Sequence, residues 1–222
     1  MFRVQNFRME LNSSNLTSGI FKSGNWRIGC DGADCETGRC LRNRIAMSPM
    51  TMYRSTDGLM NDFHLMLLGS RAAGGFGLVF GEQLAIVPEG RTSVSCGGIY
   101  DDAQIEGLAR INTLIKDMGA VPAIQLGHTG RKGSETRPWE GGEQLAPDHP
   151  QGWLVSGPSA IPYGGKYKFP VHELSREEIK ILHQRYADAA RRALDAVRTR
   201  CAAFGLEQSS PGRRGSQGGV RL

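Results

Sequence analysis

Three short apolar runs alternate with longer amphipathic stretches through the middle of the chain. The runs read RIAM at 44–47, GLVFGE at 77–82 and VPAIQLGH at 121–128. Because each run is short, apolar and bounded by turn residues, each is expected to be a buried strand. Proline has no N–H to donate to a neighbouring strand, so the first strand is expected to stop at Ser48, before Pro49.

A helical pattern follows each run. The first helix is predicted over 62–73, where two glycines end it. The second is predicted to have Asp101 as its N-cap, and its apolar positions keep helical spacing: Ile105, Leu108, Ile111, Ile115 and Met118. The third opens with a capping box of Ser175 and Glu178, and one of its faces is lined by Ile179, Leu182, Tyr186, Ala189, Ala193 and Val197.

Three strand-helix units in succession predict an α/β fold with a parallel sheet covered by helices. In such sheets the chemistry gathers at the carboxyl ends of the strands, which here carry residues 48–53, 82–83 and 125–131. At this unit length a closed barrel of eight units needs roughly 400 residues. The chain has 222 residues, so we expect a partial barrel.

Three segments lie outside these units. Residues 1–40 are expected to be irregular, and the Gly- and Pro-rich stretch 130–170 reads as a long loop without secondary structure, which indicates function or disorder. Residues 198–222 form an Arg/Gly-rich tail that is expected to be disordered. The helical pattern is lost abruptly after Ala196, as a shifted reading frame would produce, and translating the gene beyond that codon in the other frames tests this hypothesis.

The charge distribution argues against nucleic acid as a partner. The net charge is +5, but the last 25 residues contain five Arg and one Glu and so carry +4 of it. No apolar run approaches the roughly 18 residues that span a bilayer, and the first residues lack the apolar centre of a secretory signal. We therefore expect no membrane partner and a cytoplasmic location.

The cysteines do not predict a metal site. Three of the five lie close together, at Cys30, Cys35 and Cys40, with a spacing at the loose edge of zinc-ligand spacing and no fourth ligand nearby. In a cytoplasmic protein these thiols are expected to stay reduced.

Four motifs together resemble the amino-terminal half of the Old Yellow Enzyme family. They read LRNRIAMSPMTMY, DGLMNDFHLMLLGSRAAGGFGLVFGE, PEGRTS and AIQLGHTGRKG, and the resemblance covers roughly residues 41–196. It implies the first three βα units of an FMN-binding (β/α)8 TIM barrel over 41–197. It also implies hydride transfer from NADPH or NADH through FMN to a small activated alkene.

The resemblance assigns roles to residues at the strand ends. Tyr53 would face the substrate, and Thr51 would lie near the reactive edge of the flavin, where a hydroxyl tunes its potential. Gln125 has a donor and an acceptor on one amide, which suits the pyrimidine edge of the flavin. The implied cofactor-binding set is Ser48, Pro49, Met50, Thr51, Gln83 and Gln125.

Several of these residues also have a structural interpretation. Gln125 could be a satisfied structural amide, and the methionines around Ser48 could fill the core. His64 is more typical of a helix surface or of packing than of a ligand. Glu82 could act as a base, although a strand-end carboxylate that accepts from neighbouring N–H groups is the favoured interpretation.

The resemblance also implies what the chain lacks. The family's substrate-binding His or His/Asn pair, its Tyr proton donor, an Arg near the flavin and its phosphate-binding loops lie beyond strand four. Each missing charge-assisted bond to the phosphate is worth about 1.5 to 3 kcal/mol. We therefore expect weak or absent activity, and the alternative is a non-catalytic half barrel that self-associates through open sheet edges.

Overall fold

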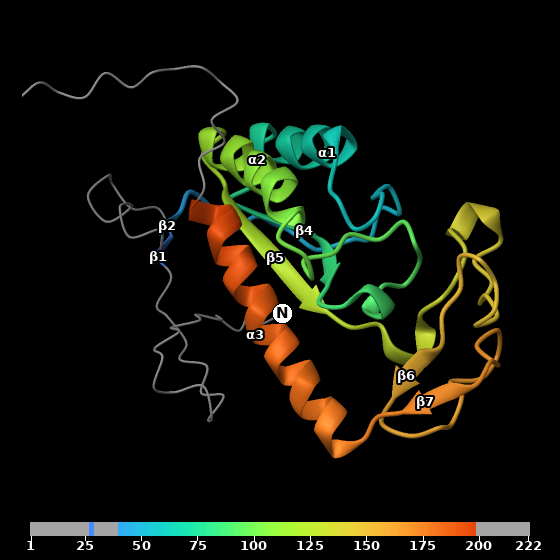
Figure 1. Ribbon diagram of the computed structural model, residues 1–222. Coiled ribbons are helices and arrows are strands. Elements are labelled where there is room, and N and C mark those ends of the chain that lie inside the picture. Colours follow the sequence, from blue (N-terminus) through green and yellow to red (C-terminus); the bar gives the residue numbers. More distant parts are fainter. Residues whose placement is uncertain (1–26, 29–39, 199–222) are drawn as a thin grey trace, which may run out of the picture.

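The computed structural model describes residues 27–28 and 40–198, and its centre is a parallel three-stranded sheet in the order β3-β4-β5. Its strands are β3 (Ala46–Met47), β4 (Leu78–Ala85) and β5 (Val121–Gly127). The helices that follow them are α1 (Asp62–Ala73), α2 (Gln104–Asp117) and α3 (Arg176–Arg198). Figure 1 shows α1 beside α2, and α3 running along β5. The predicted three βα units of a partial TIM barrel are confirmed.

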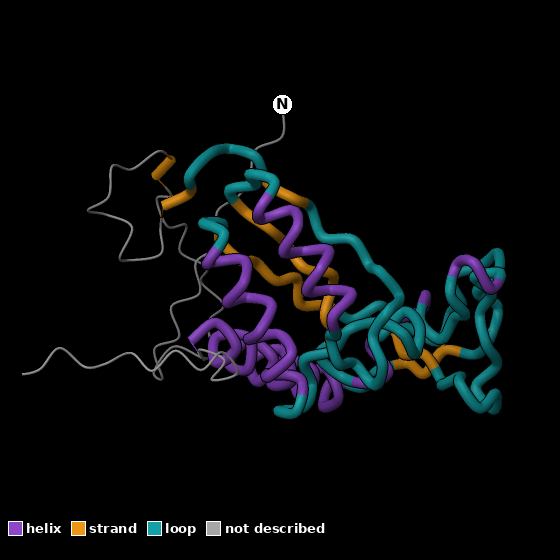
Figure 2. Tube along the Cα trace, turned by 90° about the horizontal axis from the view of Figure 1, so that it is seen from above, coloured by secondary structure: helices purple, strands orange, loops and turns teal. Residues whose placement is uncertain are grey.

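The remaining described strands form two small parallel sheets of two strands each. The first pairs β1 (Arg27–Ile28) with β2 (Cys40–Leu41), and the second pairs β6 (Val155–Gly157) with β7 (Val171–Glu173). In Figures 1 and 2 the β6-β7 pair lies at one end of the molecule, away from β4 and β5. Two short 3₁₀ helices, η3 (Gly130–Lys132) and η4 (Pro138–Glu140), precede it.

The expectation of a loop without secondary structure over 130–170 is therefore wrong. Strands of three residues are too short to show a periodic pattern, and β6 pairs with a partner more than ten residues away. Among the other sequence predictions, Cys30, Cys35 and the tail residues 199–222 lie outside the described residues.

An extra residue in β4 reverses the direction of its side chains. The ladder joins Phe80 to Ala123 and then Gln83 to Gln125, so β4 uses three steps where β5 uses two. Such a bulge shifts the alternation of side chains by one position. Val79 and Leu84 can therefore both belong to the helix-facing core, which leaves Gln83 on the other face of the sheet.

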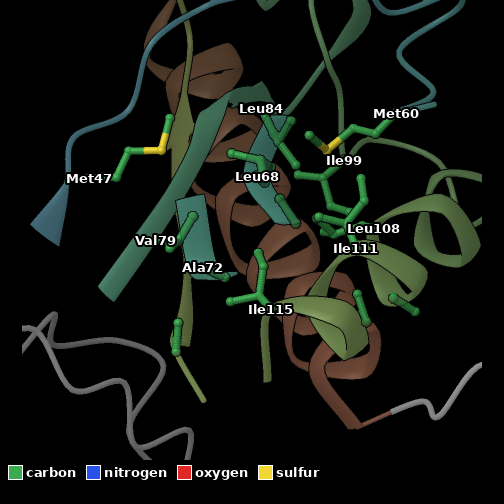
Figure 3. Close-up of a cluster of buried hydrophobic side chains, with 14 of the residues drawn as sticks. Met47, Met60, Leu68, Ala72, Val79, Leu84, Ile99, Leu108, Ile111 and Ile115 are labelled. Carbon is green, nitrogen blue, oxygen red and sulfur yellow. The ribbon is translucent and has the colours of Figure 1, made fainter. Parts of the chain in front are cut away.

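The core lies between this sheet and its helices (Figure 3). It is closed by side chains from β3, β4, α1, α2 and the loops between them: Met47, Met60, Leu68, Ala72, Val79, Leu84, Ile99, Leu108, Ile111 and Ile115. From α3, Ala189 and Ala196 reach the same cluster. Of the helices that the structure describes, none combines the length and apolar content needed to cross a bilayer.

The helix ends agree with those predicted from the sequence, except at the start of α2. The bounds of α1 and the Ser175–Glu178 capping box of α3 are confirmed. However, α2 begins at Gln104, because Asp101 caps the turn before it, where its Oδ1 accepts from the N–H of Ala103 at 2.9 Å.

Two helical glycines offer a matched test of this packing. A Cβ on Gly107 would lie 2.6 Å from the carbonyl oxygen of Met60, whereas one on Gly69 would lie 2.5 Å from a methyl group of Leu114. A backbone carbonyl cannot move aside, but a leucine side chain can. Gly107→Ala is therefore expected to destabilise the fold by about 1 to 3 kcal/mol. Gly69→Ala should stay within about 1 kcal/mol of the parent, because alanine gains helix propensity. Equal urea midpoints for both variants would contradict this packing.

The start of α3 makes stability depend on pH in acid. The backbone N–H of Ser175, the ring of His172 and the hydroxyl of Ser175 lower the pKa of Glu178 to about 2. Because this pKa is depressed in the folded state, the contribution is present above the ordinary value of 4.5 and is lost as the pH falls through about 2. An NMR titration should place the Glu178 midpoint near that value, and His172→Ala should raise it. An ordinary glutamate midpoint in the parent would refute the bonding.

Candidate functional site

The carboxyl ends of β3, β4 and β5 lie at one edge of the sheet because the three strands are parallel neighbours. The loop after β3 is fixed to the second half of β4 by the backbone N–H of Met52, which donates to Oε2 of Glu82 at 2.8 Å. The next residue of β4, Gln83, pairs with Gln125 in the ladder. Thr51 is therefore next in sequence to a residue that is anchored on β4. Gln83 and Gln125 lie side by side on the neighbouring strands β4 and β5.

Glu82 is a buried carboxylate with all its donors supplied by the fold. Its side chain is 0% exposed, and Oε1 accepts from the hydroxyl of Ser55 at 3.3 Å. The Nε2 atom of His64 lies 3.0 Å from the same oxygen. The expected bond from a neighbouring N–H group to Glu82 is present, but Glu82 lies at the bulge inside β4 and not at the end of the strand, which continues to Ala85. Both carboxylate oxygens are engaged by the fold, which favours a structural role.

His64 lies inside the fold and not on the helix surface. It is 1% exposed and occupies the N3 position of α1. The backbone N–H of Asn61 donates to Nδ1 at 3.2 Å, which places the ring proton on Nε2, facing Glu82. The imidazole thus completes the capping box and hydrogen-bonds a buried carboxylate at once. The spacing of Asn61 and His64 before an apolar helix was the sequence signal for this role.

Gln83 and Gln125 present free amides at this edge. Ile124 and Leu126 pack against the core, so Gln125, which lies between them, faces away from the helices, and it is exposed. The Gln83 side chain lies across Gly127, where an added Cβ would come within 2.4 Å of its Cδ. Neither amide has a hydrogen-bond partner within the described part of the chain, so the interpretation of Gln125 as a satisfied structural amide is not supported.

The loop after β3 is similarly open. Ser48 and Met50 are exposed and Pro49 and Thr51 are half-buried. The hydroxyls of Ser48 and Thr51 make no hydrogen bond to any residue that the structure describes. Met50 leaves 57% of its surface exposed, which disfavours the core-filler interpretation for this methionine, whereas Met47 is buried in the core.

Tyr53 is held in an uncommon conformation beside a tryptophan. Its φ of 54° lies in the left-handed region, which costs a non-glycine residue of order 1 kcal/mol. Its ring packs edge-on against Trp139 with the centroids 6.1 Å apart. Partial burial raises the pKa of Tyr53, and the nearby Cys96 and Glu135 raise it further, so the hydroxyl keeps its proton at neutral pH.

The strongest sequence motif, QLGHTGRK, serves to fasten loops together. Burial lowers the pKa of His128, and its Nδ1 accepts from the N–H of Gly130 at 3.0 Å. The Thr129 hydroxyl lies 3.0 Å from that of Thr92. Arg131 donates to the carbonyl and hydroxyl of Ser159, just after β6. These contacts hold the segment that contains β6 against the carboxyl end of the sheet.

The free groups at the edge fit a flavin ring. Thr51, Gln83 and Gln125 offer hydroxyl and amide donors and acceptors without partners in the described residues, while Glu82 and His64 beside them are fully engaged. A flat heterocycle with alternating C=O and N–H groups could satisfy such a set. The site lacks counterparts, among the described residues, to the phosphate-binding loops that the resemblance assigns to later strands.

The sequence and the fold are similar to those of known proteins. A family model described as NADH:flavin oxidoreductase / NADH oxidase matches residues 37–198. Morphinone reductase is similar in structure, with a TM-score of 0.59 and 27% identity over 70% of this chain and 42% of that chain. A 2-naphthoyl-CoA reductase gives a TM-score of 0.59 and 28% identity over 71% of this chain and 24% of that chain.

A third similar structure is the old yellow enzyme homologue from Zymomonas mobilis. Its TM-score is 0.55 and its identity 29%, over 71% of this chain and 42% of that chain. The chain therefore spans less than half the length of each of these three proteins.

Proposed function

The chain belongs to the NADH:flavin oxidoreductase / NADH oxidase family, and from this membership we propose that it is an FMN-dependent oxidoreductase of the ene-reductase type. When bound, FMN supplies the redox chemistry, hydride transfer from NADPH or NADH to an activated alkene. Morphinone reductase forms a complex with tetrahydroNAD, which supports a nicotinamide as the reductant. The proposal includes a cytoplasmic location, where reduced nicotinamides are available.

The observation that carries the proposal is the unpartnered polar edge. Gln125 and Gln83 would hold the pyrimidine edge of the flavin through amide donors and acceptors. Thr51 would donate its hydroxyl proton toward the reactive edge of the ring. Ser48, Pro49 and Met50 would contribute backbone contacts and an apolar wall, which would help to exclude water.

Tyr53 would face the alkene from the same loop. Its raised pKa keeps the phenol protonated, so the hydroxyl can donate a hydrogen bond to an electron-withdrawing oxygen of the substrate. The anchoring of Met52 on Glu82 would set the positions of both neighbours, Thr51 and Tyr53. Weak flavin binding and weak activity are expected, because the charge-assisted bonds to the FMN phosphate have no counterpart among the described residues.

A second candidate function rests on the edge of β5. Within the described residues β5 is the last strand of its sheet, and its outer edge pairs with no other strand. An open edge is a template for pairing with another chain. On this alternative the protein is a non-catalytic half barrel that self-associates.

Purification with added FMN separates the two candidates. Native mass spectrometry of the full chain should show one FMN per subunit and a yellow preparation if the first is correct. A colourless preparation whose particles are oligomers without flavin would favour the second and would reject FMN binding.

A further inference from the structure

Beside Tyr53 lies a surface that combines exposed aromatic and cationic groups, which we name the Arg54–Trp139 face. It consists of Tyr53, Arg54, Arg137 and Trp139. Trp139 leaves 56% of its surface exposed, and Arg54 is also exposed. Single exposed apolar residues are common on protein surfaces and indicate no function. A large exposed indole beside an exposed guanidinium group, in contrast, is suited to binding a flat ligand that carries a charge.

The guanidinium group of Arg54 makes cation–π contacts with aromatic rings and is not paired with a carboxylate of the described residues. Its guanidinium lies 5.3 Å from the ring centroid of Phe63 and 5.3 Å from that of Trp139. Within the described residues it forms no ion pair. Cation–π contacts leave the edge of the guanidinium, and therefore its N–H donors, available for an anion.

Arg137, the residue just before η4, lies close to the same indole. Its guanidinium lies 5.9 Å from the Trp139 ring, and its Nε donates to the hydroxyl of Ser95 at 3.0 Å. The nearest carboxylate, that of Glu140, is 3.7 Å away and itself about half exposed, so it offsets this charge only weakly.

Two carboxylates from the segments that form the face are paired with cations elsewhere. Glu135 accepts from the ammonium of Lys166 at 2.8 Å and from the hydroxyl of Tyr167 at 3.0 Å. Asp62, which follows the loop, is paired with Arg110. The face thus keeps a positive charge next to the residue proposed to meet the alkene.

The Arg54–Trp139 face is built from two distant parts of the chain that are fixed to each other. Residues 53–54 come from the loop after β3, and Trp139 comes from η4. The N–H of Glu135 donates to the carbonyl of Thr92 at 3.0 Å, and Arg137 is bound to Ser95, so the second segment is fastened to the loop after β4. The N–H of Ser55 donates to the carbonyl of Ser95 at 3.0 Å, which fastens the loop after β3 to the same place. The approach of Trp139 to Tyr53 is therefore a consequence of the packed fold.

We propose that the Arg54–Trp139 face is a specificity site for planar conjugated alkenes that carry a carboxylate, with the flat part against Trp139 and the carboxylate on Arg54. The inference rests on the proposed function for the identity of the reacting group. It adds that an anionic substrate is preferred over a neutral one of equal shape. Charge-assisted hydrogen bonds are roughly twice as strong as neutral ones, so the carboxylate ligand should bind more tightly than the neutral one.

Titration calorimetry of the full chain with cinnamate and with cinnamamide, its neutral counterpart, tests the inference without flavin. Cinnamate should bind about threefold to tenfold more tightly than cinnamamide. Arg54→Gln should remove this difference, and Arg54→Lys should keep part of it. Arg71→Gln, which neutralises an exposed arginine on α1, should leave the difference unchanged. Trp139→Ala should weaken both ligands alike.

Equal affinity of the parent protein for the two ligands would overturn the inference, as would equal losses in Arg54→Gln and Arg71→Gln. A thermal melt of each variant confirms that it is folded. A parallel FMN titration separates the two claims. Flavin binding without discrimination between the ligands rejects only the specificity site, and discrimination without flavin binding rejects only the proposed function.

Discussion

Glu82→Gln is expected to lower the free energy of unfolding by about 1.5 to 3 kcal/mol, because it places an amide group where the fold supplies only donors. The carboxylate accepts from Met52 N–H, from the Ser55 hydroxyl and from the ring of His64. A glutamine must turn its NH₂ group toward one of these donors, so at least one of them loses its partner inside the protein. Urea unfolding followed by circular dichroism measures the loss.

The same substitution should also impair the site. Without its bond to Glu82, the Met52 backbone no longer fixes the loop that carries Thr51 and Tyr53, so FMN affinity should fall as well. Glu89→Gln is the matched control, since Glu89 is exposed at the 3₁₀ turn η2 (Pro88–Gly90). Surface changes of this kind usually stay within about 0.5 kcal/mol. Indistinguishable unfolding curves for the two variants would show that the buried carboxylate has no special structural role.

Gln125→Leu is expected to weaken FMN binding about tenfold while leaving stability nearly unchanged. The amide is exposed and has no partner in the described residues, so folding loses nothing when it is removed. The flavin, in contrast, loses one donor and one acceptor, each worth about 0.5 to 1.5 kcal/mol. Quenching of flavin fluorescence during a titration measures the dissociation constant.

The control for this variant is Gln151→Leu, which makes the same chemical change at an exposed position before β6. It should bind FMN as the parent does. If Gln125→Leu lowers the unfolding free energy by more than about 1 kcal/mol, the amide has a structural partner, and its assignment to the cofactor is then unnecessary.

The local elements were predictable because their signals are local. The limits of α1 are set by an Asn cap and by two glycines, and the start of α3 is set by a capping box between Ser175 and Glu178. The order of strands and helices then predicts a parallel sheet. The Old Yellow Enzyme resemblance came from motifs at strand ends, and the family match over residues 37–198 confirms it.

The features that sequence reasoning missed depend on contacts between distant residues. The pairing of His64 with Glu82 joins α1 to β4, and the bulge in β4 exists only relative to the register of β5. Strands β6 and β7 are too short to have a pattern of their own. The approach of Trp139 to Tyr53 required that the segment before β6 fold back onto the loop after β4.

The central claim is that the carboxyl edge of β3, β4 and β5 binds the flavin ring through Thr51, Gln83 and Gln125. The most direct measurement is an NMR titration of the full chain with FMN, in which the side-chain amide signals of Gln83 and Gln125 are followed with the backbone N–H of Thr51. We expect the three signals to shift together with one dissociation constant, while the amide of Gln151 stays unchanged. Saturating FMN that leaves the Gln83 and Gln125 amides unmoved would contradict the account.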